Sequence, residues 1–117
     1  MKKITLLLIL CICSSFIQTE DSYKMTVTKI ADAYNANDAD QIFGLFSPEL
    51  QSSFTLDKVK TFITDNHNKK GKMGSSSFLM DDEGTKHYLM EFDNSSTILI
   101  LGLSTDNKIT QLALEEY

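Results

Sequence analysis

The chain has 117 residues, of which 42% are hydrophobic and 23% are charged, and its formal net charge at pH 7 is −5. This composition is typical of a globular protein, and the length suffices for one domain. Because the chain is acidic and contains no Arg, it lacks the cations that neutralise phosphates and read base edges, so we expect no nucleic-acid partner.

The N-terminal segment has the layout of a secretory signal. Lys2 and Lys3 precede the almost entirely apolar run Ile4–Cys13, and two serines follow it. This order of basic, apolar and small residues marks a segment that is removed on export, and the apolar run is too short for a stable membrane span. We therefore expect a signal peptide over residues 1–15.

The mature chain, residues 16–117, is expected to fold as a single domain in the periplasm or outside the cell. Both cysteines, Cys11 and Cys13, precede it, so it would hold no disulfide and no thiolate ligand. Loss of two lysines with the signal would change the net charge to −7. An alternative is that Cys13 carries the lipid of a membrane-anchored lipoprotein, although Ile12 stands where such a signal has a small residue.

Helical periodicity and capping residues predict helices in the first half of the mature chain. Apolar residues at helical spacing predict a first helix over residues 22–35. Asp38, Ser47 and Thr55 are typical N-caps, so a second, third and fourth helix should begin after them. The fourth helix should end near Gly71.

Beyond residue 72 the pattern changes to two-residue alternation, which is typical of strands. It predicts four strands, over residues 73–80, 86–93, 96–104 and 109–115. The connections are short, so neighbouring strands should be antiparallel. The predicted fold class is α+β, with N-terminal helices packed on a curved four-stranded antiparallel sheet.

The third predicted strand, Ser96–Ser104, is apolar on both faces and carries no charge. Ile98 and Ile100 alternate with a row of leucines, namely Leu99, Leu101 and Leu103. The helices can cover only one face of the sheet, and the sequence leaves open which one. We expect the leucine row to lie on the uncovered face and to form an interface, with a second copy of the chain or with another exported protein.

Three stretches of the helical half share a pattern of packing and capping residues. They are Ala33-Tyr34-Asn35-Ala36-Asn37-Asp38, Ile42-Phe43-Gly44-Leu45-Phe46-Ser47-Pro48-Glu49-Leu50, and Thr55-Leu56-Asp57-Lys58 continuing to Phe62. The pattern resembles a bacterial domain of unknown function with the cone-shaped nuclear transport factor 2-like (cystatin-like) fold, over about Tyr23 to Glu116. Such a domain often precedes a secreted serine hydrolase of the beta-lactamase or peptidase type. The resemblance implies this fold and an exported location, and it brings no catalytic residues.

The polar residues give little indication of catalysis or of a metal site. His67 lies near a helix end without Cys or a second His at ligand spacing, so a solvated histidine is expected. His87 and Glu91 share one face of a strand and could form an acid–base pair, but the more apolar Tyr88 face should point inward and leave them outside. The stretch Asp81-Asp82-Glu83-Gly84 lacks the spacing of a calcium loop and predicts a polar turn.

Aromatic residues can converge between the helices and the sheet. The set is Tyr34, Phe43, Phe46, Phe62, Tyr88 and Phe92. They form the core by default, or they line an apolar pocket at the open end of the cone, where such folds bind small ligands.

The sequence thus predicts an exported, non-enzymatic accessory or binding domain without a cofactor, which binds a small apolar ligand or a protein partner. Two alternatives stay open: a small isomerase- or dehydratase-like enzyme that uses the cone interior, and a purely structural dimerisation module.

Overall fold

The computed structural model describes residues 20–117, so the predicted signal peptide and the alternative lipid anchor at Cys13 lie outside the described residues. Helices come first and strands follow, which confirms the predicted α+β class. The helices are α2 (Glu20–Asn35), α3 (Ala39–Gly44), α4 (Pro48–Ser53) and α5 (Leu56–Lys70). The strands are β1 (Met73–Asp82), β2 (Thr85–Phe92), β3 (Ser96–Leu103) and β4 (Ile109–Glu116). Within residues 20–117, no helix is both long enough and apolar enough to cross a membrane.

The three predicted N-caps are confirmed. The side chain of Asp38 accepts a hydrogen bond from the backbone N–H of Gln41, and Ser47 and Thr55 make the same contact at α4 and α5. Each cap satisfies one of the backbone N–H groups that a helix start leaves unpaired. At the other end of α5, Gly71 takes a φ of +87°, a conformation that glycine adopts more readily than other residues.

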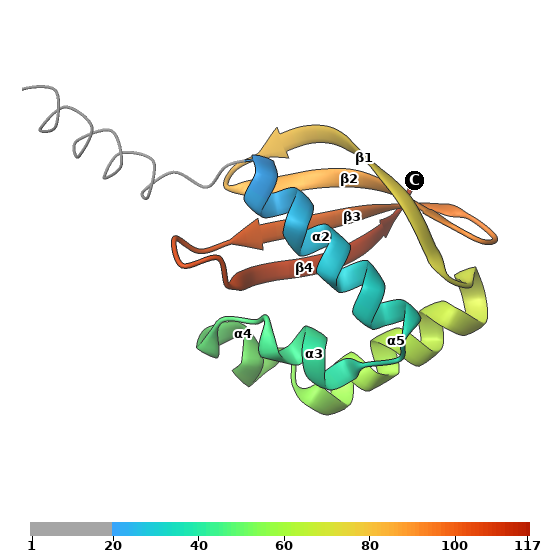
Figure 1. Cartoon of the computed structure of the whole chain (residues 1–117), viewed down its shortest axis with the longest axis horizontal. Helices are drawn as coiled ribbons and strands as arrows, with labels where there is room; N and C mark the ends of the chain where they lie inside the picture. The colour runs from blue at the N-terminus through green and yellow to red at the C-terminus, as the bar shows by residue number, and fades with distance from the viewer. Residues whose placement is uncertain (1–19) are drawn as a thin grey trace, which may run out of the picture.

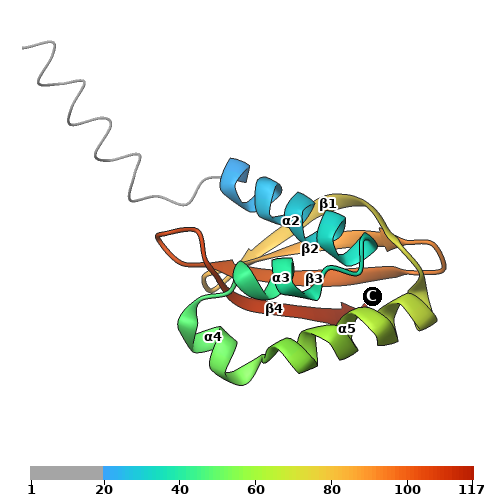
Figure 2. The same ribbon diagram turned by 60° about the horizontal axis from the view of Figure 1, so that its bottom comes forward.

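The four strands form one antiparallel meander in the order β1-β2-β3-β4. Figures 1 and 2 show α2 crossing one face of this sheet, with α3, α4 and α5 on the side of β4. The predicted inward face of β2 is confirmed, because Tyr88 and Met90 are buried against the helices. The opposite face has no helix from the described part of the chain over it.

The register between β2 and β3 decides which face of β3 is inside. Leu99 lies opposite Tyr88 and Leu101 lies opposite Lys86, so both leucines share the inward face. Their exposed fraction is 0%, and Leu103 packs half-buried against the same core. The expected assignment of these leucines to an uncovered interface is therefore corrected: Ile98 and Ile100 form the outward row.

Two polar side chains of α2 form hydrogen bonds with the backbone at the start of the sheet. The Tyr34 hydroxyl donates to the carbonyl oxygen of Gly71 at 2.7 Å. The Asn35 side-chain amide exchanges two hydrogen bonds of 2.9 Å with the backbone of Met73. Both contacts join the last turn of α2 to the α5–β1 connection, so the helical layer and the sheet are held in one orientation.

Candidate functional site

The six aromatic residues proposed to line a pocket lie in the packed interior. Tyr34, Phe46, Tyr88 and Phe92 are buried, while Phe43 and Phe62 are half-buried and pack against the core. The ring of Phe54 continues the cluster, with its centroid 5.2 Å from that of Phe46 and 5.8 Å from that of Phe62. Since edge-to-face and tilted rings at such distances fill the space between them, these side chains act as core.

His67 is more constrained than a solvated helix-end histidine would be. Its ring stacks on Tyr34 with 4.2 Å between centroids and 8° between planes. Its Nε2 lies 2.8 Å from the carbonyl oxygen of Tyr34, which can only accept, so Nε2 carries the proton. The imidazole thus supports the α2–α5 contact, and the expectation of a merely solvated side chain is corrected.

Two interior tyrosines hold their protons more tightly than usual. Burial, with a contribution from the Asp93 carboxylate, raises the pKa of Tyr34 to about 12. Burial also raises the pKa of Tyr88 to about 12, with further contributions from Tyr23 and the carboxylates of Glu20 and Asp81. In each case the apolar surroundings disfavour the phenolate.

We expect the fold to lose stability as the pH rises from about 10 to about 12. A tyrosine in the unfolded chain loses its proton near pH 10, whereas Tyr34 and Tyr88 keep theirs to about 12. The unfolded state therefore binds fewer protons in this interval, so the free energy of unfolding falls with pH. Urea denaturation at a series of pH values measures the loss, and Tyr34→Phe should reduce its slope. A flat profile up to pH 12 would contradict the assignment.

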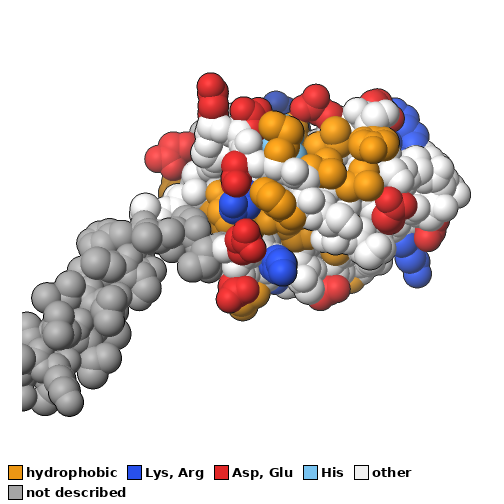
Figure 3. Space-filling view, turned by 90° about the horizontal axis from the view of Figure 1, so that it is seen from above, with side chains coloured by type: hydrophobic (Ala, Val, Ile, Leu, Met, Phe, Trp, Pro, Cys, Tyr) orange, Lys and Arg blue, Asp and Glu red, His pale blue; other side chains and the backbone are white. Residues whose placement is uncertain are grey.

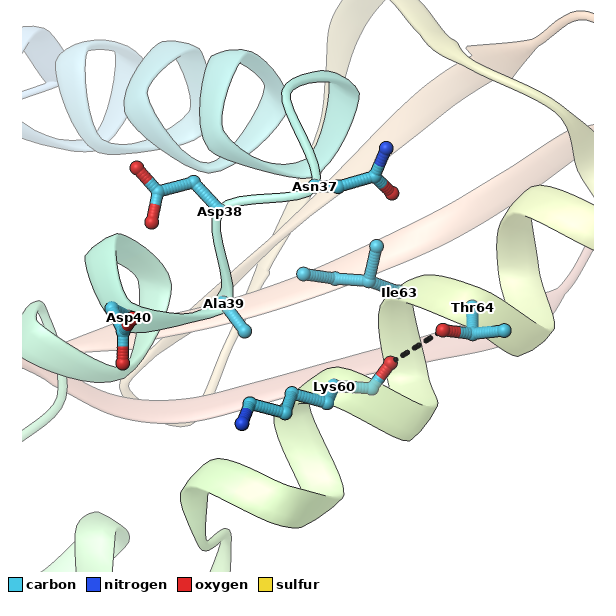
Figure 4. A pocket seen from close by; sticks show the side chains of 7 residues that line it. All are labelled: Asn37, Asp38, Ala39, Asp40, Lys60, Ile63 and Thr64. Atoms are coloured by element: carbon cyan, nitrogen blue, oxygen red, sulfur yellow. Dashed lines mark hydrogen bonds between the residues drawn. The ribbon is translucent and has the colours of Figure 1, made fainter.

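A groove lies between α3 and α5, with a volume of about 340 Å³ (Figure 4). Asp38 and Asp40 stand on one wall and Lys60 on the other, with Ile63 nearby. Asp38 is already used as the cap of α3, and the Thr64 hydroxyl donates to the carbonyl oxygen of Lys60 at 3.0 Å. These polar groups serve the helices themselves, so the groove lacks a set of side chains converging on a ligand.

A second cavity, of about 260 Å³, lies on the outer sheet face and holds several titratable groups. His87 Nε2 lies 3.7 Å from a carboxylate oxygen of Asp82, and Glu115 lines the same cavity. This distance exceeds that of a hydrogen bond, so the imidazole is not oriented as a general base. His87 and Glu91 do not form the acid–base pair considered for them, because they lie four residues apart on β2, which is roughly 13 Å along a strand. Glu91 instead accepts from the Ser96 hydroxyl at 2.9 Å.

The outward apolar row of β3 is mostly shielded by its neighbours within the sheet. Ile98 lies opposite Leu89 on β2 and Glu115 on β4, and Ile100 lies between His87 and Ala113. Ile100 is 6% exposed, and Ile98 and Leu89 are half-buried. The uncovered face therefore offers less apolar surface than the sequence predicts.

The largest exposed apolar surface on the strands lies at the free edge of the sheet. Phe78, Leu79 and Met80 follow one another on β1 and are 46%, 42% and 49% exposed. β1 has a strand on one side only, and every residue after Met73 is exposed. Figure 3 views the molecule from the side of β1 and shows hydrophobic side chains gathered there.

The other edge of the sheet is partly closed by the protein itself. At the start of β4, the N–H of Ile109 donates to the carbonyl oxygen of Leu45, and the N–H of Ser47 donates to that of Ile109, both at 2.8 Å. A short parallel bridge joins Phe46 to the same residue. The edge of β1 thus differs from the edge of β4 in lacking such a cover from the described residues.

Comparisons with family models, with curated proteins and with solved structures find no match to this chain. Among residues 20–117, no cluster of three or more His, Cys, Asp or Glu side chains could hold a metal ion.

Proposed function

We propose that this chain is an exported accessory domain with the nuclear transport factor 2-like cone fold, and that it acts by binding another protein rather than by catalysis. Within residues 20–117, the order of four helices followed by a four-stranded antiparallel meander is compatible with such a cone. The capping pattern at Asp38, Ser47 and Thr55 is the part of the resemblance that the helices reproduce.

The observation that carries the proposal is the exposed apolar edge of β1. A long edge strand with apolar side chains presents unpaired backbone N–H and C=O groups, and it offers a partner both hydrogen bonds and apolar contacts. The aromatic interior is filled with side chains, which favours a protein partner at the surface over a small apolar ligand inside the cone. The bound partner would cover Phe78, Leu79 and Met80.

A small enzyme is the second candidate, and the cavity on the outer sheet face favours it. His87, Asp82 and Glu115 could share proton transfer there once a substrate draws them closer. Assays with ester, glycoside and enolisable ketone substrates, on the wild type and on His87→Gln, test this candidate. Turnover that the substitution abolishes would favour the enzyme over the binding domain.

We expect a cross-linking probe on β1 to capture a protein partner in the producing cell. A photoreactive benzoylphenylalanine replaces Leu79, and in a matched control it replaces Met25, which is 60% exposed on α2. Illumination should give a discrete adduct for position 79 and none for position 25. Mass spectrometry of the adduct identifies the partner. The absence of an adduct at position 79, or equal adducts at both positions, would contradict a binding surface on β1.

We expect the exported protein to lack residues 1–15. If residues 1–15 are a signal peptide, the protein recovered from outside the cytoplasm should lack their mass. Intact mass spectrometry measures this directly, and an added lipid mass at Cys13 would point to the lipoprotein alternative. Recovery of the full chain from the cytoplasm would be incompatible with an exported domain.

A further inference from the structure

We propose that the partner of β1 is β1 of a second copy, paired antiparallel about a two-fold axis at Ser77. This inference rests on the proposed binding function and names its partner. In this register each residue lies opposite the one at an equal distance on the other side of Ser77 of the second copy. The two four-stranded sheets would become one continuous sheet of two copies, related by the axis that a self-complementary surface requires.

The side chains of β1 are distributed as such a pairing needs. After the buried Met73, the first half of the strand is small, with Gly74 followed by Ser75 and Ser76, and Phe78, Leu79 and Met80 make the second half large. About Ser77 the small half of one copy meets the large half of the other, so that Phe78 faces Ser76 and Leu79 faces Ser75. Large side chains opposite small ones can lie across the new strand pair without a clash, and they would cover apolar surface that is 42–49% exposed in the single chain.

The irregularities of β1 are also arranged about Ser77. One bulge lies between Met73 and Ser76 and the other lies between Phe78 and Met80, while the segment between them pairs regularly with β2. Bulges commonly protect an edge strand by bending it away from a partner. Here a two-fold axis at Ser77 would place the bulge of each copy beside the bulge of the other, so both strands would bend at matching positions.

Charges at the two ends of β1 support the antiparallel direction. Lys72 precedes the strand and is exposed, and Asp82 ends it with its side chain 53% exposed. In the proposed register Lys72 of each copy lies opposite Asp82 of the other, and Glu83 lies just beyond it. A parallel pairing would set like charges side by side at each end, so electrostatics select the antiparallel arrangement.

Disulfide cross-linking tests the register. Residues directly opposite in an antiparallel pair have Cα atoms about 4.5–5.5 Å apart, within the range that a disulfide spans. In a chain whose Cys11 and Cys13 are replaced by Ser, Ser77→Cys should therefore form a disulfide-linked dimer on mild oxidation. The control Ser75→Cys should stay monomeric, since two copies of residue 75 would lie roughly 13 Å apart along the strands. Adding Leu79→Cys to Ser75→Cys should restore cross-linking.

Sedimentation equilibrium of the protein without cysteine substitutions tests the dimer itself. We expect a reversible dimer, whose dissociation constant Leu79→Lys raises at least tenfold and Met25→Lys leaves unchanged. Added salt should weaken the dimer because its terminal charge pairs are exposed. A wild type that stays monomeric at high micromolar concentration overturns the pairing, and so does a dimer without the Ser77→Cys link. A position-79 photo-adduct with a different protein would overturn the pairing and leave the proposed binding function standing.

Discussion

Replacing Phe46 by Ala should lower the free energy of unfolding by about 3–5 kcal/mol, the usual cost of truncating a core Phe. Its side chain is 2% exposed and lies between the rings of Phe43 and Phe54. The backbone at Phe46 also bridges to Ile109, so the cavity would open where the helices meet the last strand. The loss is a large share of the roughly 5–15 kcal/mol that stabilises a domain, and urea denaturation measures it.

Phe43→Ala is the matched control for this cavity. Phe43 contacts the same ring but is only half-buried, so its truncation removes less apolar surface from the core. We expect a loss of about 1–2 kcal/mol for this variant. A loss below about 1 kcal/mol for Phe46→Ala, or one no larger than that of the control, would place Phe46 outside the core.

Gly71→Ala should destabilise the protein by about 2–4 kcal/mol. The residue has φ +87° and ψ −151°, a backbone conformation that is nearly restricted to Gly and that costs other residues roughly 1–3 kcal/mol. An added Cβ would also stand 2.6 Å from the Cβ of Asp93. The Asp93 carboxylate accepts from the backbone N–H of Lys72, so the displaced side chain would give up a hydrogen bond worth about 1 kcal/mol.

Gly84→Ala is the control for the steric contact. Gly84 has a similar φ of +86°, but an added Cβ would meet no atom within 4 Å. This variant should therefore show backbone strain alone, with a loss of about 1 kcal/mol. A loss for Gly71→Ala no larger than that for Gly84→Ala, measured by the same denaturation, would contradict the larger cost expected at Gly71.

Local signals predicted the elements well because each depends on a few neighbouring residues. Ser is a preferred N-cap and Pro a preferred first helical residue, and α4 begins at Ser47-Pro48 in this way. The predicted strand over residues 86–93 differs from β2 by one residue at each end. Its alternation puts Tyr88 inside because the inward and outward sets differ clearly in polarity.

The inside of β3 could not be predicted because both of its faces are apolar. Alternation does not indicate whether Ile98 or Leu99 points inward, and the pairing with the neighbouring strand decides this. Leu99 lies opposite Tyr88, whose inward direction is fixed by its own strand, so the register of the β2–β3 pair settles the question. A sequence pattern read one strand at a time does not contain this information.

The edge of β1 was also not predicted as a binding surface. Gly74 and three serines have low strand propensity, so the stretch gives a weak strand pattern overall. Phe78, Leu79 and Met80 stand at its far end. The signal present in the sequence is three consecutive large apolar residues directly before an acidic turn. Consecutive residues of a strand point to opposite faces, so one buried face cannot cover all three. The predicted meander already places this strand at an edge, and the structure adds that all three side chains there are exposed.

The order of the elements along the chain has a consequence for synthesis. The helices are synthesised first, yet two of their contacts need strands that are made later. The Tyr23 hydroxyl accepts from the backbone N–H of Leu103, eighty residues further on, and the carbonyl oxygen of Leu45 accepts from the N–H of Ile109. Helices of 6 to 16 residues are marginal alone in water, so they have nothing to pack on while the sheet is unmade. A growing chain should therefore remain loose until its last strand leaves the ribosome, which is the condition in which a polypeptide can be threaded through a narrow channel.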